Sequence, residues 1–307
     1  MRKIRVSLIG VAIAAMVAAL GALPAVGDDP PFVGWSTLAP SLSTTYEPNS
    51  ANVCNRGDIR CVDATIREMQ RRFDPLAGSC SHDAIFALTY LRTTEEYRRS
   101  VSDPAFFTDT PFVNHEDAVF ASYYFGAYDN WHNGAQAQVP GAWQVALDAA
   151  DRRTVSGTGD LLLGVNAHVN RDLPYVLAAI GLVKGDGTSR KPDHDKVNEI
   201  LNRVYGPVLS EAARRFDPAI SNAVFDGTTL DDAALMQILV GWREQAWRNA
   251  ERLAAAPTPA DRATVTQSIE AAATLEAQTI VAQTRYTPPA TTTTSRDAYC
   301  ATHHNDT

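Results

Sequence analysis

The 307-residue sequence is 45% hydrophobic and 20% charged, with 27 Lys and Arg residues against 35 Asp and Glu residues and a formal charge of −8. A chain of this length and composition has ample material for a hydrophobic core, in one large domain or two small ones. Because nucleic-acid binding depends on basic side chains that contact phosphates, the acidic excess predicts that nucleic acid is not a stable partner.

Residues 1–27 have the three-part pattern of a secretory signal peptide. Three cations among the first five residues precede an uncharged apolar run over 6–23, and small residues then lead to a cleavage site near Gly27. The apolar run could instead persist as a membrane anchor, since its length is close to the roughly 18 residues that span a bilayer. No later stretch is as long and apolar, so we expect a secreted or extracellular protein without a transmembrane segment once the signal is removed.

Four cysteines follow the signal peptide, and an even count in an exported chain predicts disulfides. Cys54 and Cys61 bracket a turn-forming segment, residues 55–58, which can bring their Cα atoms within bonding range. We therefore predict the pairs Cys54–Cys61 and Cys80–Cys300, the second of which would join the end of the chain to its body. A zinc site of four thiolates is disfavoured, because the sequence has no paired C-x-x-C spacing.

The rest of the chain predicts one all-α globular domain with short flanking segments. Residues 28–61 are rich in Pro, Ser and Thr and lack periodicity, which predicts an extended N-terminal arm. Residues 62–285 show helical periodicity throughout, with no convincing strand pattern. Residues 286–307 contain a Pro pair and a Thr run, which predict a flexible C-terminal tail. About eight helices are expected: over 62–73, 81–98, 110–134, 139–150, 161–182, 198–216, 231–255 and 259–284.

The most unusual stretch, residues 164–174, is polar and ionisable but lies between two apolar runs. On a helix, His168 and Asp172 are four residues apart, so their side chains leave the same face with Cβ atoms about 5–6 Å apart. That spacing suits a His/carboxylate pair on one metal ion, or an imidazole oriented by its own carboxylate. Pro174 has no N–H with which to continue the helix, so the helix must kink or restart there, with Leu173 as the cap residue.

Asn166 and Asn170 form a second pair four residues apart, rotated by roughly 160° from the first. The apolar segment therefore carries polar groups on two faces. Since buried polar groups need partners, the His/Asn/Asp cluster could also be a hydrogen-bond network in the core of the domain. The sequence leaves both interpretations open.

Further ionisable residues lie on the neighbouring predicted helices. His115 is followed by Glu116 and Asp117, whose place near a helix start is also explained by the helix dipole. His194 and Asn198 repeat the four-residue spacing of the central pair. If these helices pack together, the histidines would add to the polar cluster in the core.

Residues 164–174, with residues 114–120 before them and 191–198 after them, resemble the bacterial family called domain of unknown function 5995. The resemblance covers residues 63 to 253 approximately. That family has no established activity to transfer, so the resemblance implies a fold and not a function.

A weaker resemblance connects the chain with zinc-dependent phospholipase C and the related single-strand nucleases, which are secreted and all-helical. These domains bind zinc through His-x-x-x-Asp and His-x-x-x-Glu pairs, and the pair His168/Asp172 followed by His194 is similar in order. Three features depart from that pattern: the mature chain does not begin with Trp, no His closely follows Asp172, and Asn198 replaces the second acid. The resemblance therefore implies one or two metal ions at most.

The weaker resemblance implies a metal-dependent hydrolase of extracellular phosphoesters or lipid-like esters. The metal would lower the pKa of a bound water to about 7. Glu116 or Asp117 would take a proton from that water, and Arg171 would hold an anionic substrate. The expected zinc ligands are His115, His168, Asp172 and His194.

The alternative hypothesis is a secreted binding or structural protein without enzymatic activity. The His/Asn/Asp cluster would then be a core network, and the aromatic region around Tyr123, Tyr124 and Trp131 would bind a small apolar molecule, a lipid or an envelope partner. This hypothesis predicts that no metal is bound and that replacing His168 or Asp172 costs about 1–3 kcal/mol of stability. A serine hydrolase is disfavoured because the sequence has no Gly-x-Ser-x-Gly motif.

Overall fold

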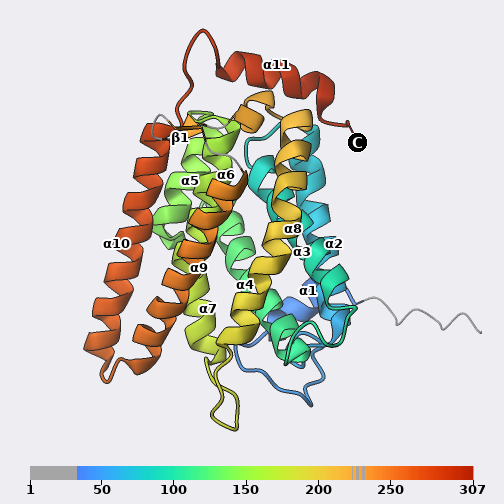
Figure 1. Cartoon of the computed structure of the whole chain (residues 1–307), viewed down its shortest axis with the longest axis vertical. Helices are drawn as coiled ribbons and strands as arrows, with labels where there is room; N and C mark the ends of the chain where they lie inside the picture. Colours follow the sequence, from blue (N-terminus) through green and yellow to red (C-terminus); the bar gives the residue numbers. More distant parts are fainter. Residues whose placement is uncertain (1–32, 223, 226–227, 230–231, 307) are drawn as a thin grey trace, which may run out of the picture. The chain divides into compact units, whose positions relative to one another are not determined.

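The computed structural model describes residues 33–222, 224–225, 228–229 and 232–306, so the predicted signal peptide lies outside the described residues. In this part of the chain the protein is all-α, with ten helices of eight or more residues and one very short β-hairpin (Figure 1). The long helices are α2 (Ile59–Gly78), α3 (Ala84–Ser100), α4 (Thr110–His132), α5 (Gly141–Asp151), α6 (Gly157–Val165), α7 (Leu173–Ile180), α8 (Lys191–Arg215), α9 (Asp232–Ala255), α10 (Pro259–Gln283) and α11 (Thr293–His303).

Short elements complete the described fold. They are α1 (Trp35–Leu38), the 3₁₀ turns η1 (Ala39–Ser41), η2 (Gln136–Gln138) and η4 (Pro218–Asn222), the π-helix η3 (Asn166–Asp172), and the strands β1 (Val224–Phe225) and β2 (Thr228–Thr229), which pair antiparallel. No helix in the described ranges combines the length and the apolar character needed to cross a bilayer.

Several helix starts coincide with capping residues. Asp58 accepts a hydrogen bond from the N–H of Arg60 at the start of α2, and Ser156 accepts one from the N–H of Gly159 at the start of α6. Thr258 likewise caps α10, which follows α9 after a three-residue turn. Such caps satisfy N–H groups that have no partner within the helix. The short turn between α9 and α10 lets the two helices lie side by side, as Figure 1 shows.

The central polar stretch forms the π-helix η3, which contacts α4, α5, α6, α7, α9 and α10. The N–H of Leu173 donates to the carbonyl of His168, five residues back, which is the hydrogen bond of a π-helix. Pro174 has no N–H to extend this pattern, and α7 starts at Leu173 with Pro174 in its first turn. The predicted restart is therefore present, one residue earlier than expected. It splits one predicted helix into α6, η3 and α7, which is one reason why ten helices are found and not eight.

Gly164 allows α6 to approach α3 closely. A Cβ atom at this position would overlap the Phe86 side chain, both at its own Cβ and in its ring. We expect Gly164→Ala to lower the free energy of unfolding by about 1–3 kcal/mol, because overpacking forces neighbouring groups to shift. Urea denaturation would measure the change.

The matched control for this substitution is Gly126 on α4, where an added Cβ would meet nothing within 4 Å. Gly126→Ala should raise stability by about 0.5–1 kcal/mol, since Ala is the better helix former. Equal effects of the two substitutions would contradict the close approach of α6 and α3.

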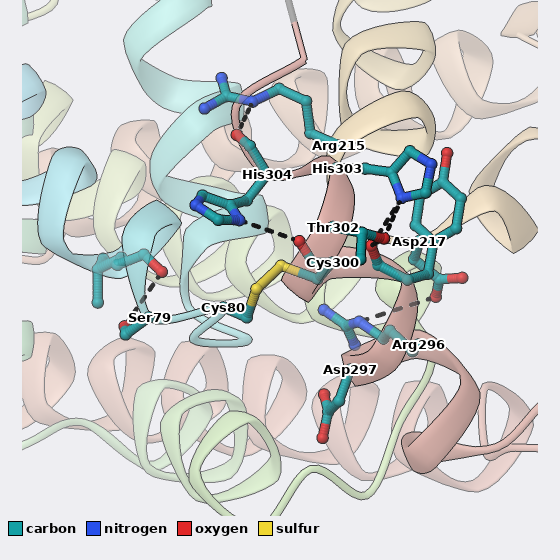
Figure 2. Close-up of a disulfide and its surroundings, with 12 residues drawn as sticks. Ser79, Cys80, Arg215, Asp217, Arg296, Asp297, Cys300, Thr302, His303 and His304 are labelled. Carbon is teal, nitrogen blue, oxygen red and sulfur yellow. Dashed lines mark hydrogen bonds and ion pairs between the residues drawn. A yellow bond between two sulfur atoms is a disulfide. The ribbon is translucent and has the colours of Figure 1, made fainter.

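Both predicted disulfides are present. The Cα atoms are 4.9 Å apart in Cys54–Cys61 and 5.9 Å apart in Cys80–Cys300. The first closes the loop before α2, and the second joins α11 to the turn between α2 and α3 (Figure 2). All four cysteines of the sequence are therefore paired.

The expectation of a flexible tail over 286–307 is corrected by the structure. This segment contains α11, whose Cys300 is bonded to Cys80 and whose Arg296 side chain is buried (Figure 2). A composition rich in Pro and Thr predicts disorder, but composition does not show whether a segment forms a covalent link or buries a cation. Those two attachments order the segment, and α11 is the other helix missing from the sequence-based expectation.

The expected extended arm over 28–61 is also folded where it is described. It contains the short helix α1, in which Trp35 and Leu38 are buried. The Trp35 ring packs edge-on against Phe125 of α4, with 5.3 Å between ring centroids. These two large apolar side chains help to hold this otherwise polar segment against the helices.

Candidate functional site

A cavity of about 120 Å³ lies between α3, α4, η3, α8 and α9. Its size is close to that of an engineered apolar cavity of about 150 Å³ that binds benzene. The walls are mainly apolar, so the cavity suits a ring-sized molecule. Among its lining residues are Phe86, Phe120, Val169, Leu173, Leu201 and Leu239.

Three polar atoms without partners belong to residues that line this cavity. They are His168 Nε2, Asp117 Oδ2 and Tyr90 Oη, each buried and without a hydrogen-bond partner among the described residues. Only seven such side-chain atoms occur in the described chain, and three of the seven belong to this one cavity. A buried polar group left unpaired costs about 1–3 kcal/mol. A bound molecule that satisfies these groups would recover that cost.

Asp172 determines how His168 faces the cavity. Asp172 Oδ2 lies 3.2 Å from His168 Nδ1 and accepts a hydrogen bond from Trp143 Nε1 at 2.8 Å, while Oδ1 accepts one from Arg171 at 2.9 Å. With the carboxylate acting as acceptor for all three groups, Nδ1 must carry the hydrogen. Burial lowers the pKa of His168, which favours the neutral imidazole. Nε2 therefore keeps a lone pair.

Aromatic rings hold the imidazole in place. The Phe120 ring stacks on His168 with centroids 3.5 Å apart and an angle of 8° between the planes. The Tyr90 ring lies 4.5 Å from the imidazole centroid, and the Phe86 ring lies 5.8 Å away. Rotation of the imidazole would displace these packed rings, so Nε2 has a fixed direction.

Two carboxyl groups on α4 also line the cavity. Glu116 and Asp117 are half-buried residues, and protein atoms surround their carboxyl groups. The pKa of each is raised to about 7, mainly by burial. The charge of Glu116 adds to the rise for Asp117, whereas the charge of Arg243 opposes the rise for Glu116. Both carboxyl groups can therefore hold or release a proton near neutral pH.

Comparison with known proteins identifies the family of the chain. A sequence model described as "Family of unknown function (DUF5995)" matches residues 62–283, well over half of the chain. The chain belongs to the DUF5995 family. No curated protein and no solved structure matches it.

In this DUF5995 member, the four expected zinc ligands are not brought together. The ring nitrogens of His115 lie 3.1 and 3.2 Å from the carbonyl oxygens of Cys54 and Thr44. His194 Nε2 lies 3.2 Å from the carbonyl oxygen of Arg243. Neither histidine lines the cavity, whereas His168 does and contacts Asp172. Packing directs the other two imidazoles toward local carbonyl groups, so these four residues do not form a common metal centre.

The three expected catalytic residues do not all lie at the cavity. Glu116 and Asp117 share the cavity with His168, but Arg171 does not line it. Arg171 donates to Asp172 and Glu270, and its guanidinium lies 4.7 Å from the Tyr175 ring centroid. It therefore positions Asp172 and links η3 to α10.

The aromatic region around Tyr123, Tyr124 and Trp131, which the binding hypothesis assigned to a ligand, does not line the cavity either. Tyr124 is buried and stacks on Trp143 with centroids 5.4 Å apart. Trp131 Nε1 donates to Asp151 at 2.7 Å. Phe120, one helical turn before Tyr124, is the aromatic residue of α4 that lines the cavity.

One other group of possible metal ligands exists in the described chain. Ligand atoms of Asp83, His132 and Asp151 all lie within 4.8 Å of one another. Asp83 is buried, while His132 and Asp151 are exposed, and His132 Nε2 lies 3.5 Å from Asp83 Oδ2. Asp83 raises the pKa of His132, as an ion pair does. The ion pair accounts for Asp83 and His132, and Asp151 accepts a hydrogen bond from Trp131.

Sequence reasoning missed Tyr90 and Arg243. A signal for Tyr90 existed, since Phe86, Tyr90 and Tyr97 follow helical spacing along one face of α3. Arg243 has no such local signal. It donates to the Asn198 side chain at 2.8 Å and to the His194 carbonyl at 2.6 Å, both on α8, and these contacts depend on the packing of two separate helices.

Proposed function

We propose that this DUF5995 member is a binding protein for a small, mainly apolar molecule that carries a hydrogen-bonding group. The observation that supports the proposal is the presence of three unpartnered polar atoms on an apolar cavity large enough for a ring. Ligand sites commonly combine an apolar lining with a few convergent polar groups. A purely structural core would pair these atoms with one another or with the backbone.

A hydroxyl group is the polar group that best matches the cavity. His168 Nε2 offers a lone pair to a hydroxyl hydrogen, since Nδ1 is engaged with Asp172. Tyr90 Oη and a protonated Asp117 can each donate to the hydroxyl oxygen. A phenol-like molecule would therefore satisfy both the apolar lining and the unpartnered atoms.

The metal-dependent hydrolase is not supported by the same geometry. His115 and His194 are engaged with carbonyl groups outside the cavity, which leaves His168 and Asp172 as the only expected zinc ligands in contact. A catalytic zinc site usually has three protein ligands. His168 and Asp172 are one ligand short of that number. Two disulfides support the proposal that the protein works outside the cytoplasm.

Phenol and benzene form a matched pair that tests the proposal. Phenol should bind about 2–12 times more tightly than benzene, because one net hydrogen bond is worth about 0.5–1.5 kcal/mol. Isothermal titration calorimetry would measure both affinities. His168→Phe should remove the preference for phenol while benzene still binds, and circular dichroism would show that the variant is folded.

Leu239→Phe is the control for the site itself, since Leu239 lines the cavity and a larger side chain would fill it. Both probes should lose affinity in this variant. Tyr90→Phe, which removes only a hydroxyl group, should reduce the preference for phenol without affecting benzene. Failure of both probes to bind the native protein would overturn the proposal.

A further inference from the structure

The cavity contains a histidine arranged as a general base. Nδ1 of His168 is held by Asp172, and Nε2 has no partner within the described chain. In this arrangement the carboxylate fixes the tautomer and stabilises the imidazolium that forms when Nε2 takes a proton. Trp143 and Arg171 in turn hold both oxygens of Asp172. The base is therefore positioned before any ligand enters.

A carboxyl group in the same cavity can act as the acid. Asp117 precedes Phe120 by three residues on α4, so their Cβ atoms are about 5–6 Å apart on one face of the helix. The Phe120 ring is stacked on His168, and Asp117, Phe120 and His168 all line the same cavity. Asp117 Oδ2 has no partner in the described structure. Its pKa of about 7, raised mainly by burial, leaves much of the group protonated at neutral pH.

We propose that this cavity catalyses proton transfer at the carbon next to the carbonyl group of a ring-sized ketone, with His168 as the base and Asp117 as the acid. The inference rests on the proposed function, since it requires the cavity to admit a small, mainly apolar molecule. It adds a reaction and a substrate class. Asp172 is a positioning residue, because it acts through His168.

The proposed step balances without any co-reactant. His168 Nε2 takes a proton from the carbon, and the electron pair of that C–H bond becomes the new C=C bond. The carbonyl π pair moves to oxygen, which takes the proton of Asp117. Return of a proton to the same or a conjugated carbon restores the ketone, with His168 neutral and Asp117 protonated again. The mainly apolar lining strengthens the hydrogen bond to the developing oxyanion.

Deuterium exchange of cyclopentanone tests this inference. In D₂O, reversible removal of the α-hydrogens replaces their proton NMR signal, and the rate is read from the loss of that signal. The native protein should exceed an equal concentration of free imidazole. His168→Gln and Asp172→Asn should slow the exchange about 100-fold, and Asp117→Asn about 10-fold or more, as expected for general acid–base groups.

A readout specific to positioning comes from the ¹⁵N shifts of the His168 ring. They should report hydrogen on Nδ1 in the native protein and on Nε2 in Asp172→Asn, a change that loss of packing alone would not produce. His132→Gln is the matched histidine control, because His132 does not line the cavity. It should leave the exchange rate unchanged.

Binding of cyclopentanone and phenol, titrated in the same samples, separates the two proposals. Bound cyclopentanone without exchange above the imidazole rate would overturn the catalytic inference and leave the binding function intact. Phenol binding without cyclopentanone binding would overturn the assignment to ketones. Absence of both would overturn both proposals. Undiminished exchange in His168→Gln would overturn the role of His168.

Discussion

Replacing Arg296 by alanine is expected to lower the free energy of unfolding by about 3–5 kcal/mol, because it leaves a buried carboxylate without its cation. Arg296 is 4% exposed and donates to Asp160 Oδ2 at 2.6 Å. The same guanidinium nitrogen lies 3.0 Å from His82 Nδ1. Asp217 is 3.9 Å from Arg296 Nε (Figure 2). Equilibrium urea denaturation would measure the loss.

The control for this substitution is Arg152→Ala. Arg152 pairs with Asp148 four residues earlier, but their side chains are 71% and 45% exposed. An exposed pair contributes about 0–1 kcal/mol, so this variant should stay close to the native protein. Similar losses in the two variants would show that burial of the Arg296 pair has no special importance.

The stability lost in the Arg296→Ala variant should also depend on pH. Burial raises the pKa of Asp160, and the charge of Arg296 opposes that rise. Removing Arg296 would therefore raise the pKa of Asp160 further. A folded-state pKa above the unfolded value gives stability that is present at low pH and is lost as pH rises through the folded pKa. His82 lies 3.5 Å from Asp160 and is also held by Asp297. Burial and the charge of Arg296 both lower the pKa of His82, so removing Arg296 would raise it and would change stability in the same direction. The loss of stability in Arg296→Ala should be larger at pH 8 than at pH 5.

Removing the Cys80–Cys300 disulfide in a Cys80→Ala/Cys300→Ala variant is expected to cost about 2–5 kcal/mol, since the bond restricts the unfolded chain. The two residues are 220 positions apart, so the closed loop contains most of the described chain. Its entropy contribution should exceed that of Cys54–Cys61, whose residues are seven positions apart. Urea denaturation of both double variants would compare them.

Limited proteolysis would show where the Cys80–Cys300 variant opens. With the disulfide gone, α11 loses its covalent link to the rest of the chain and keeps noncovalent contacts such as the one from Arg296 to Asp160. Cleavage near the chain end should therefore increase before cleavage elsewhere. An unchanged unfolding midpoint and an unchanged cleavage pattern would contradict the role of this bond in ordering the chain end.

The features predicted correctly from sequence depend on neighbours along the chain. Contact between His168 and Asp172 follows from their four-residue spacing, and so does the hydrogen bond from Asn170 to Asn166 at 2.9 Å. The restart next to Pro174 follows from the missing N–H of this residue. These outcomes require only helical geometry and covalent chemistry, which the local sequence contains.

The cavity depends instead on which faces of separate helices meet. Glu116 and Asp117 were identified as candidates, but their shared cavity with His168 arises only when α4 packs against η3 and α3. His115, next to Glu116 in sequence, points to the carbonyl groups of Thr44 and Cys54, away from that cavity. Adjacent residues on a helix leave it in directions about 100° apart, so packing separates their environments.

The sequence by itself determined the all-α class and the polar character of the central stretch, because composition and helical periodicity are local properties. It also determined the two disulfide pairs, because the short Cys54–Cys61 loop leaves Cys80 and Cys300 as the remaining pair of an even set. The tertiary structure decided that Tyr90 and Arg243 join the cavity, that His194 does not, and that α11 is held by the buried Arg296. These outcomes depend on contacts between residues tens to hundreds of positions apart, and such contacts exist only after the helices have packed.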